Sequence, residues 1–263
     1  MPIRLVPGLA LTLLLSGMLQ PARADEALTT DRPDFSESPE VVGAGRFQIE
    51  TSVAFERDKR EGTHTRSTPT LLRLGVSKAW ELRVETDGLM RQRSSVGGTT
   101  ETVSGTSDTA LGVKWHMQDG DEDDGKPSIA WLFHVDMDTG SPAFRGQGLR
   151  PSLRMVSEWE YDGGWSLGVM PGIYSDKNAQ GERFVGGLLA LALSKQLTPK
   201  LSAVAEFAAK QVASRKNGGN VFTFDPAIAY LLSDTAQIDF GIDFGLNRNA
   251  PDTTAAIGLS LKF

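Results

Sequence analysis

After its first 24 residues, this chain repeatedly alternates apolar and polar side chains with a period of two, the spacing of a β-strand whose two faces meet different surroundings. In residues 45–57, for example, Phe47, Ile49, Val53 and Phe55 occupy alternate positions, with mostly polar side chains between them. No later window approaches the ~20 consecutive apolar residues of a membrane-spanning helix. The pattern therefore predicts an all-β protein made of many two-faced strands.

About twelve such runs can be identified, and most are long enough to cross a bilayer as tilted strands, which need about 9–11 residues each. Their expected bounds are 45–57, 68–76, 80–93, 108–118, 128–138, 151–161, 165–174, 183–196, 200–212, 221–232, 235–246 and 253–263. In 183–196, Leu188 to Leu193 is apolar on both faces, which also fits a helix.

The joins between these runs alternate in length. Joins after odd-numbered runs span 6 to 14 residues, and joins after even-numbered runs span 2 or 3, except for 119–127. A transmembrane barrel sorts its joins in this way, because its periplasmic turns are tight and its external loops are longer. We therefore expect an antiparallel transmembrane β-barrel of about 12 strands with both termini in the periplasm. A soluble β protein of the periplasm or the exterior is the alternative.

The charged side chains support the same interpretation. They share the face opposite the apolar one, and a charge facing lipid at the midplane would cost about 2–4 kcal/mol. We expect these charges to line the lumen, where they tune permeation or only pair with one another to hold the barrel open. The candidates for the permeation path are Glu50, Arg73, Arg83, Glu85, Asp108, Lys114, Asp136, Arg154 and Glu158. Among them, Arg73, Arg83 and Lys114 are expected to form a basic ladder opposed by lumen acids.

The segments before the barrel have other roles. Residues 1–24 have the layout of a cleaved signal peptide: a positive start, a leucine-rich run and Ala22-Arg23-Ala24 before the cleavage site. Residues 25–44 contain Pro33 and Pro39 and show no alternation, so they precede the barrel of residues 45–263 as a periplasmic tail or a lumen plug. The plug and gate candidates are Asp31, Arg32, Asp34, Phe35 and Glu37.

Composition excludes several classes of protein. The absence of cysteine excludes disulfide-stapled modules, thiolate zinc sites, iron–sulfur clusters and cysteine nucleophiles. Three histidines make a His-rich metal site a poor fit, and a net charge of −6 argues against a nucleic-acid binder. We expect no metal, no cofactor, no catalytic residue and no enzyme activity. A Ser–His pair formed across strands, as in a barrel-embedded hydrolase, stays open because sequence does not show register.

Two patches resemble a known bacterial family. Thr30 to Glu37, followed by Gly45 to Glu50, is similar to the opening of an outer-membrane family labelled "putative MetA-pathway of phenol degradation", and Ser107 to Lys114 is similar to one of its recurring segments. The resemblance implies a Gram-negative outer-membrane barrel that passes small molecules, with aromatic solutes suggested by the family label alone. The terminal Phe263 resembles the signature that the barrel-assembly machinery recognises.

These observations lead to a functional hypothesis. The chain is expected to be an outer-membrane channel for the passive passage of small, hydrophobic or aromatic solutes, without a cofactor. Its partners would be the solute, outer-membrane lipid and, during biogenesis, the assembly machinery. The alternative is a non-transporting barrel with a structural or surface-interaction role, and a barrel-embedded hydrolase is third. The solute, the open or plugged state and the oligomeric state stay undetermined.

Overall fold

The computed structural model describes residues 28–213 and 219–263, so the predicted signal peptide lies outside the described residues. Fifteen strands are present in the described part. Their bounds are β1 Phe47–Asp58, β2 Thr63–Ser67, β3 Thr70–Gly75, β4 Trp80–Thr86, β5 Leu89–Val96, β6 Thr99–Thr106, β7 Thr109–Gln118, β8 Ser128–Met137, β9 Arg150–Tyr161, β10 Trp165–Lys177, β11 Arg183–Thr198, β12 Leu201–Val212, β13 Val221–Ser233, β14 Ala236–Gly245 and β15 Thr253–Lys262. Within these ranges no helix is long and apolar enough to cross a bilayer.

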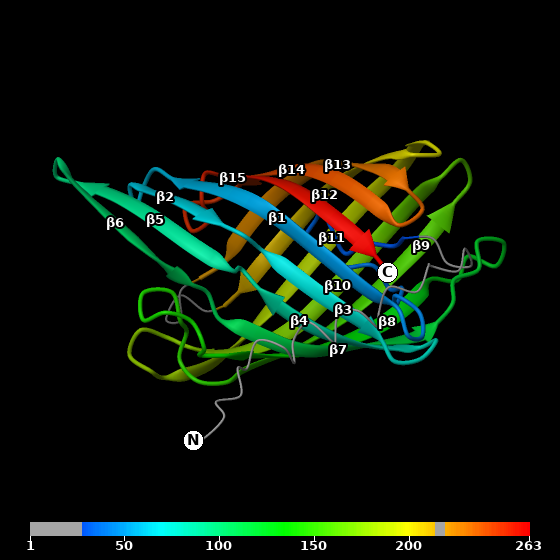
Figure 1. Ribbon diagram of the computed structural model, residues 1–263, viewed down its shortest axis with the longest axis horizontal. Coiled ribbons are helices and arrows are strands. Elements are labelled where there is room, and N and C mark those ends of the chain that lie inside the picture. The colour runs from blue at the N-terminus through cyan, green and yellow to red at the C-terminus, as the bar shows by residue number, and fades with distance from the viewer. Residues whose placement is uncertain (1–27, 214–218) are drawn as a thin grey trace, which may run out of the picture.

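The strands form one antiparallel sheet that closes on itself. Sequential neighbours pair from β7 to β15, β7 pairs with β4, β4 with β3 and β3 with β1, and β15 pairs with β1 to complete the ring. Three barrel strands are each interrupted once, and their two parts are β2 with β3, β4 with β5, and β6 with β7. The fifteen segments therefore make a closed barrel of twelve strands (Figure 1). This confirms the predicted fold class. The segment with a possible helical pattern is strand β11.

Two of the expected long loops are instead strands. Residues 63–67 and 99–106, expected to lie in the joins 58–67 and 94–107, form β2 and β6 and pair with β1 and β5. Together, β2, β5, β6 and the end of β1 make a sheet that extends beyond the barrel rim (upper left in Figure 1). Their sequences lack an apolar face, and the search for apolar alternation therefore missed them.

The two ends of the barrel differ. At one end, termed the turn end, β9–β10, β11–β12 and β13–β14 are joined by 162–164, 199–200 and 234–235. At the other, the loop end, the joins 138–149 and 246–252 are longer, but 59–62, 97–98 and 178–182 are short, and 119–127 at the turn end is long. The predicted alternation of long and short joins is therefore only partly present in the structure. The barrel begins and finishes at the turn end, where the Phe47 amide donates to the Phe263 carbonyl at 3.2 Å and the Phe263 amide donates to the Phe47 carbonyl at 2.8 Å.

The two faces of the wall have opposite chemistry. Exposed outward side chains are apolar and include Leu74, Trp80, Leu82, Leu111, Trp115, Phe133, Leu191, Phe207, Phe240 and Ile257. Buried inward side chains are largely polar and include Gln48, Glu50, Arg73, Glu81, Arg83, Lys114, His134, Glu206, Asp225 and Asp239. At the turn end, the rings of Trp80 and Trp115 stack with centroids 5.6 Å apart. This arrangement matches a wall that faces lipid outside and a polar lumen inside.

The lumen wall has one apolar region. Strands β8 to β12 contribute a buried cluster that we call the apolar strip, made of Ala130, Leu132, Val156, Met170, Leu188, Ala190 and Ala208. Phe35, from the segment before β1, and Tyr174 of β10 pack against it. The interior is thus divided between a charged side on β1, β3, β4 and β7 and an apolar side on β8 to β12.

Candidate functional site

The described residues before β1 run through the inside of the barrel. This N-terminal segment, residues 28–46, enters at the turn end, where the Leu28 amide donates to the Asp234 carbonyl at 3.0 Å. It returns to the same end, where the Gly45 amide donates to the Gly75 carbonyl at 2.8 Å. Between these points it bonds to side chains from β1, β3, β4, β7, β9, β12 and β14. The segment is therefore a hairpin that fills the middle of the lumen.

Three wall cations converge on one carboxylate of this segment. Arg73 of β3 lies directly opposite Arg83 of β4. Lys114 of β7 lies opposite Glu81, which is also on β4. The Asp31 carboxylate lies 2.6 Å from Nη1 of Arg83, 2.9 Å from Nζ of Lys114 and 3.4 Å from Nη1 of Arg73. Burial alone would raise the pKa of Asp31, but these cations hold it well below its usual value. Asp31 therefore stays ionised and joins the segment to the wall.

Wall acids complete the neutralisation of these cations. Arg73 binds Glu50 at 3.0 Å and Glu81 at 2.9 Å, and Arg83 binds Glu85 at 3.0 Å. Buried charges are tolerated when each finds partners with good geometry, and a cation with several carboxylates meets that condition. We call Asp31, Arg73, Arg83, Lys114 and their carboxylate partners the charge network.

A glycine makes room for one member of the wall. His134 of β8 lies beside Gly112 of β7, and its Nε2 is 3.1 Å from Glu85. A Cβ on Gly112 would lie 2.0 Å from Cδ2 of His134, so only glycine fits there without displacing the ring.

The tip of the hairpin is held from the opposite side of the lumen. The amides of Phe35 and Ser36 donate to Glu206 of β12 at 3.0 and 2.7 Å, and Arg154 donates to Glu37 at 2.7 Å. The Ser36 hydroxyl donates to Asp34 at 2.9 Å. Burial, together with the nearby charge of Glu206, raises the pKa of Asp34 to about 8. The tip thus carries a carboxyl group that is protonated at neutral pH.

The Phe35 ring lies between the charged and apolar parts of the lumen. It packs against the apolar strip, and the cationic groups of Lys210 and Arg154 lie 5.6 and 6.0 Å from its centroid. Both distances allow cation–π attraction.

A second ion pair fixes the entering limb of the hairpin. Nη2 of Arg32 lies 2.8 Å from Asp239 of β14. A Cβ on Gly258 of β15 would lie 2.4 Å from Nε of Arg32 and 2.5 Å from both carboxylate oxygens of Asp239. The pair therefore occupies the space that glycine leaves on the neighbouring strand.

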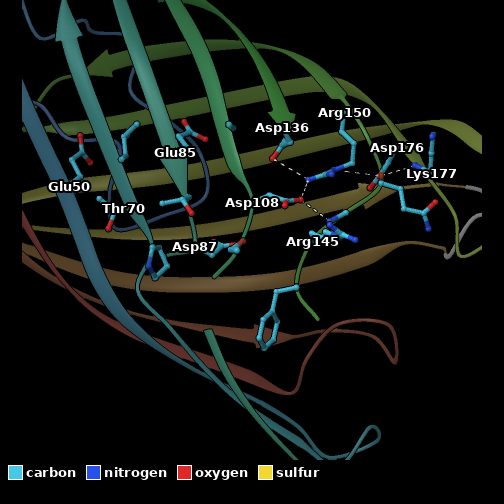
Figure 2. Close-up of a pocket in the computed structure, with 18 of the residues that line it drawn as sticks. Glu50, Thr70, Glu85, Asp87, Asp108, Asp136, Arg145, Arg150, Asp176 and Lys177 are labelled. Carbon is cyan, nitrogen blue, oxygen red and sulfur yellow. Dashed lines mark hydrogen bonds and ion pairs between the residues drawn. The ribbon is translucent and has the colours of Figure 1, made fainter. Parts of the chain in front are cut away.

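Toward the loop end, the lumen opens into a cavity of about 660 Å³ (Figure 2). Asp108 receives bonds from the amides of Gly140 and Gly146 at 2.8 and 2.7 Å and from Nη2 of Arg150 at 2.7 Å. Burial opposes ionisation of Asp108, but these donors hold its pKa below the usual value. Figure 2 shows Arg150 directed toward Asp108 and Asp136. Asp108 thus anchors the join 138–149, which contributes Phe144 to the cavity lining.

The structure groups the predicted site residues unevenly. The plug candidates Asp31 and Glu37 lie within one cluster with six wall candidates: Glu50, Arg73, Arg83, Glu85, Lys114 and Arg154. The other two plug candidates at the tip, Asp34 and Phe35, lie beside Glu206. Asp108 and Asp136 lie apart, near Arg150 in the outer cavity, and Glu158 lines cavities toward the turn end.

Sequence reasoning did not name several members as site residues, among them His134, Asp239, Glu81, Glu206 and Arg150. Glu81 has the same phase as Arg83 two residues later, which was an available signal. Glu206 was one more lumen acid with nothing to distinguish it, and Arg150 fell in an expected loop.

The geometry bears on two kinds of chemistry, metal binding and serine–histidine hydrolysis. In the described residues, one group of possible metal ligands comes together, Glu37, Glu85 and His134. Nη2 of Arg83 lies 2.8 Å from Glu37 and 3.0 Å from Glu85, so a guanidinium already neutralises these carboxylates. The His134 ring contacts Arg83 and Glu85, and the His116 ring contacts Pro39 and Asp119, so in the described ranges neither ring pairs with a serine hydroxyl.

A closed antiparallel barrel with an apolar exterior and a polar lumen defines the class of outer-membrane β-barrels. An outer-membrane channel of Pseudomonas putida F1 superposes with a TM-score of 0.60 at 10% identity, covering 88% of this chain and 100% of that one. The KdgM porin in complex with disordered oligogalacturonate gives 0.55 at 9% identity, covering 82% and 99%. The β domain of the Bordetella autotransporter BrkA gives 0.51 at 10%, covering 82% and 99%. At these identities the likeness shows the fold alone.

The family follows from the sequence itself. Residues 30–263 match the family described as "Putative MetA-pathway of phenol degradation", and the chain belongs to it. This confirms the resemblance carried by the two patches. A comparison with curated proteins finds no match.

Proposed function

We propose that this protein is an outer-membrane channel for the passive passage of small hydrophobic or aromatic solutes. In this proposal the turn end and both termini face the periplasm, and the loop end faces the exterior. Membership of the family and the channel-type fold support the location and the general activity. No energy source or cofactor is part of the proposal.

The observation that carries the solute class is the apolar strip. Outward apolar residues of a barrel are explained by contact with lipid, but Leu132, Met170 and Leu188 point into the lumen. Binding sites for apolar ligands combine such surfaces with a few polar groups. The strip supplies the apolar surface, and Tyr174 supplies a hydroxyl at its border. A hydrophobic solute would follow the strip when the hairpin leaves it.

The N-terminal segment is the proposed gate. It occupies the middle of the lumen and covers the strip with Phe35, so its displacement from the wall would open the path. Apart from the backbone bonds at its two ends and the packing of Phe35, its attachment consists of ion pairs and hydrogen bonds to side chains, which can exchange for water one at a time.

The test is the uptake of a solute panel by a deletion strain that carries the intact gene, no gene or a variant. Leu132→Asn combined with Met170→Gln makes the strip polar, and we expect it to slow uptake of aromatic solutes at least several-fold while leaving that of small sugars unchanged. Ser202→Asn, on the inner wall outside the strip, is the control. Equal aromatic uptake by the strip variant and the intact protein would contradict the proposed solute class.

The competing function is a non-transporting barrel whose loops act in structure or in surface interactions. The dense attachment of the hairpin favours it, since a permanently filled lumen would pass nothing. Purified protein without residues 28–45 separates the two: solute flux into proteoliposomes supports the channel, and the absence of any flux supports the alternative.

A further inference from the structure

The protruding sheet carries an unusual concentration of positive charge on its outward face. Arg57 of β1, Arg66 of β2, and Arg91 and Arg93 of β5 are all exposed, and we call these four residues the arginine patch. The exposed His64 lies among them, opposite Arg57 on one side and Arg93 on the other. Acidic residues are absent from the positions of this face, although the chain as a whole has a net charge of −6.

Register places these groups close together. Arg66 lies opposite Arg91 in one row, and Arg57, His64 and Arg93 form the next row two residues farther along. Neighbouring strands are about 4.8 Å apart and alternate residues about 7 Å apart, so the cations arise from an area of roughly 10 Å by 7 Å. An area of this size accommodates more than one phosphate group.

The arginines of the patch have no acidic partner. The nearby Lys59 and Arg60 pair with Asp252 and Glu61, at 3.7 and 3.1 Å. By contrast, across residues 28–213 and 219–263, no carboxylate lies within ion-pairing distance of a patch arginine, and Arg66 only covers the ring of Phe55 at 5.5 Å. Four like charges held together without counter-charges are a repulsive arrangement unless an anion binds them.

The height of the patch on the barrel identifies its surroundings. Outward Trp80 marks the turn-end boundary, and outward Leu89, which is 67% exposed, immediately precedes Arg91 on the same face. Eleven residues of tilted strand separate Trp80 from Arg91, which corresponds to roughly 28 Å along the membrane normal. An outer-membrane barrel has an apolar band about 25 Å tall. The patch therefore begins where the hydrocarbon ends, at the depth of the lipid headgroups.

We propose that the arginine patch binds the phosphate groups of a phosphorylated glycolipid in the outer leaflet. Arginine presents a rigid fork of donors that matches phosphate, and partial desolvation beside lipid strengthens such contacts. Leu89, one row before Arg91 on the same face, and Phe55, beside Arg66 in the first row of the patch, would contact the first carbons of the same lipid's acyl chains. The inference rests on the proposed orientation, with the loop end outside the cell, and concerns a surface separate from the lumen.

The test measures binding of bisphosphorylated lipid A to the purified mature protein in neutral detergent by native mass spectrometry. Arg57, Arg66, Arg91 and Arg93 are changed together to Gln, and we expect the affinity to fall at least about 10-fold. The control changes Lys78, Lys126, Lys195 and Lys200 to Gln, which removes the same charge at the turn end and leaves the affinity unchanged. Lipid A without phosphates should bind the unaltered protein no better than it binds the arginine variant.

Three results would overturn the inference: unchanged affinity in the arginine variant, an equal loss in the lysine control, or equal binding of lipid A with and without phosphates. Displacement of lipid A by an excess of inorganic phosphate alone would likewise show a free-anion site. If the four-residue variant does not fold, as judged by heat-modifiable gel migration, Arg66→Gln with Arg91→Gln serves instead. Solute flux is measured separately, so failure of the channel and failure of the lipid site are distinguishable.

Discussion

Oδ2 of Asp31 lies 2.6 Å from Nη1 of Arg83, and the two side chains are only 3% and 1% exposed. The pair joins the segment before β1 to the wall at a point screened from bulk water. Removing one partner of a buried ion pair costs about 3–5 kcal/mol, because the other charge is left without compensation. The attachment of the N-terminal hairpin to the lumen wall therefore depends strongly on the Asp31 carboxylate.

Asp31→Asn should weaken the attachment of the hairpin and raise channel conductance. Arg73 would lose its carboxylate partner in the segment, and Arg83 and Lys114 would keep only Glu37 there, so the weaker attraction between wall and segment favours release. Planar-bilayer recording measures the open fraction, and thermal unfolding measures the stability loss. Glu61→Gln, which changes an exposed acid, should alter neither quantity. Unchanged conductance with a lowered Tm would assign Asp31 to stability alone.

The attachment should also weaken as pH rises. Docking raises the pKa of Asp34 from 3.8 to about 8, so the docked segment retains a proton that the released segment has lost. The free energy that favours the docked state therefore decreases as pH increases. It reaches its lowest value above about pH 8, where docked Asp34 is also ionised. Conductance recorded between about pH 6 and about pH 9 should rise for the unaltered protein and stay flat for Asp34→Asn. A parallel rise in both would attribute the effect to another group.

At the loop end, Asp108→Asn should release the join 138–149. The amide cannot accept from Gly140, Gly146 and Arg150 as the carboxylate does, because half of its polar group is a donor. We expect passage of larger solutes in liposome-swelling assays. Asp138→Asn is the matched control, since Asp138 is exposed and accepts only the Gly148 amide, at 3.2 Å. Identical size cut-offs for the two variants would show that the join does not restrict the path.

Two glycine-to-alanine changes should differ sharply. In Gly258→Ala the new methyl would overlap Arg32 and Asp239, so this ion pair must separate and the hairpin loses an attachment. In Gly168→Ala the new methyl would meet Ala192 at 3.7 Å, an ordinary contact. We expect the first variant to lose roughly 1–3 kcal/mol of stability through broken hydrogen bonds, and therefore to have a lower Tm. The Tm of the second variant should stay near that of the unaltered protein. Equal Tm values would contradict the described packing.

Alternation was sufficient to predict the barrel and the inward direction of the wall charges. Searching for one apolar face identified a run in each of the twelve barrel strands. The same search excluded Thr63–Ser67 and Thr99–Thr106, which lie in the protruding sheet and have no apolar face. The charge network depends on register instead. Nothing in the order of residues shows that Arg73 lies opposite Arg83, or that Asp31 reaches Lys114 across 83 positions. For the same reason the apolar strip, which is assembled from β8 to β12, was not predicted.

The course of the hairpin has a mechanical consequence. Both of its limbs pass through the same mouth of the barrel, beside the Asp234 and Gly75 carbonyls. It can therefore be withdrawn whole from that mouth without threading an end through the cylinder, and no residue has to cross to the far side. The ten paired positions between β1 and β15 can stay bonded throughout, so unblocking the interior does not require the cylinder itself to come apart.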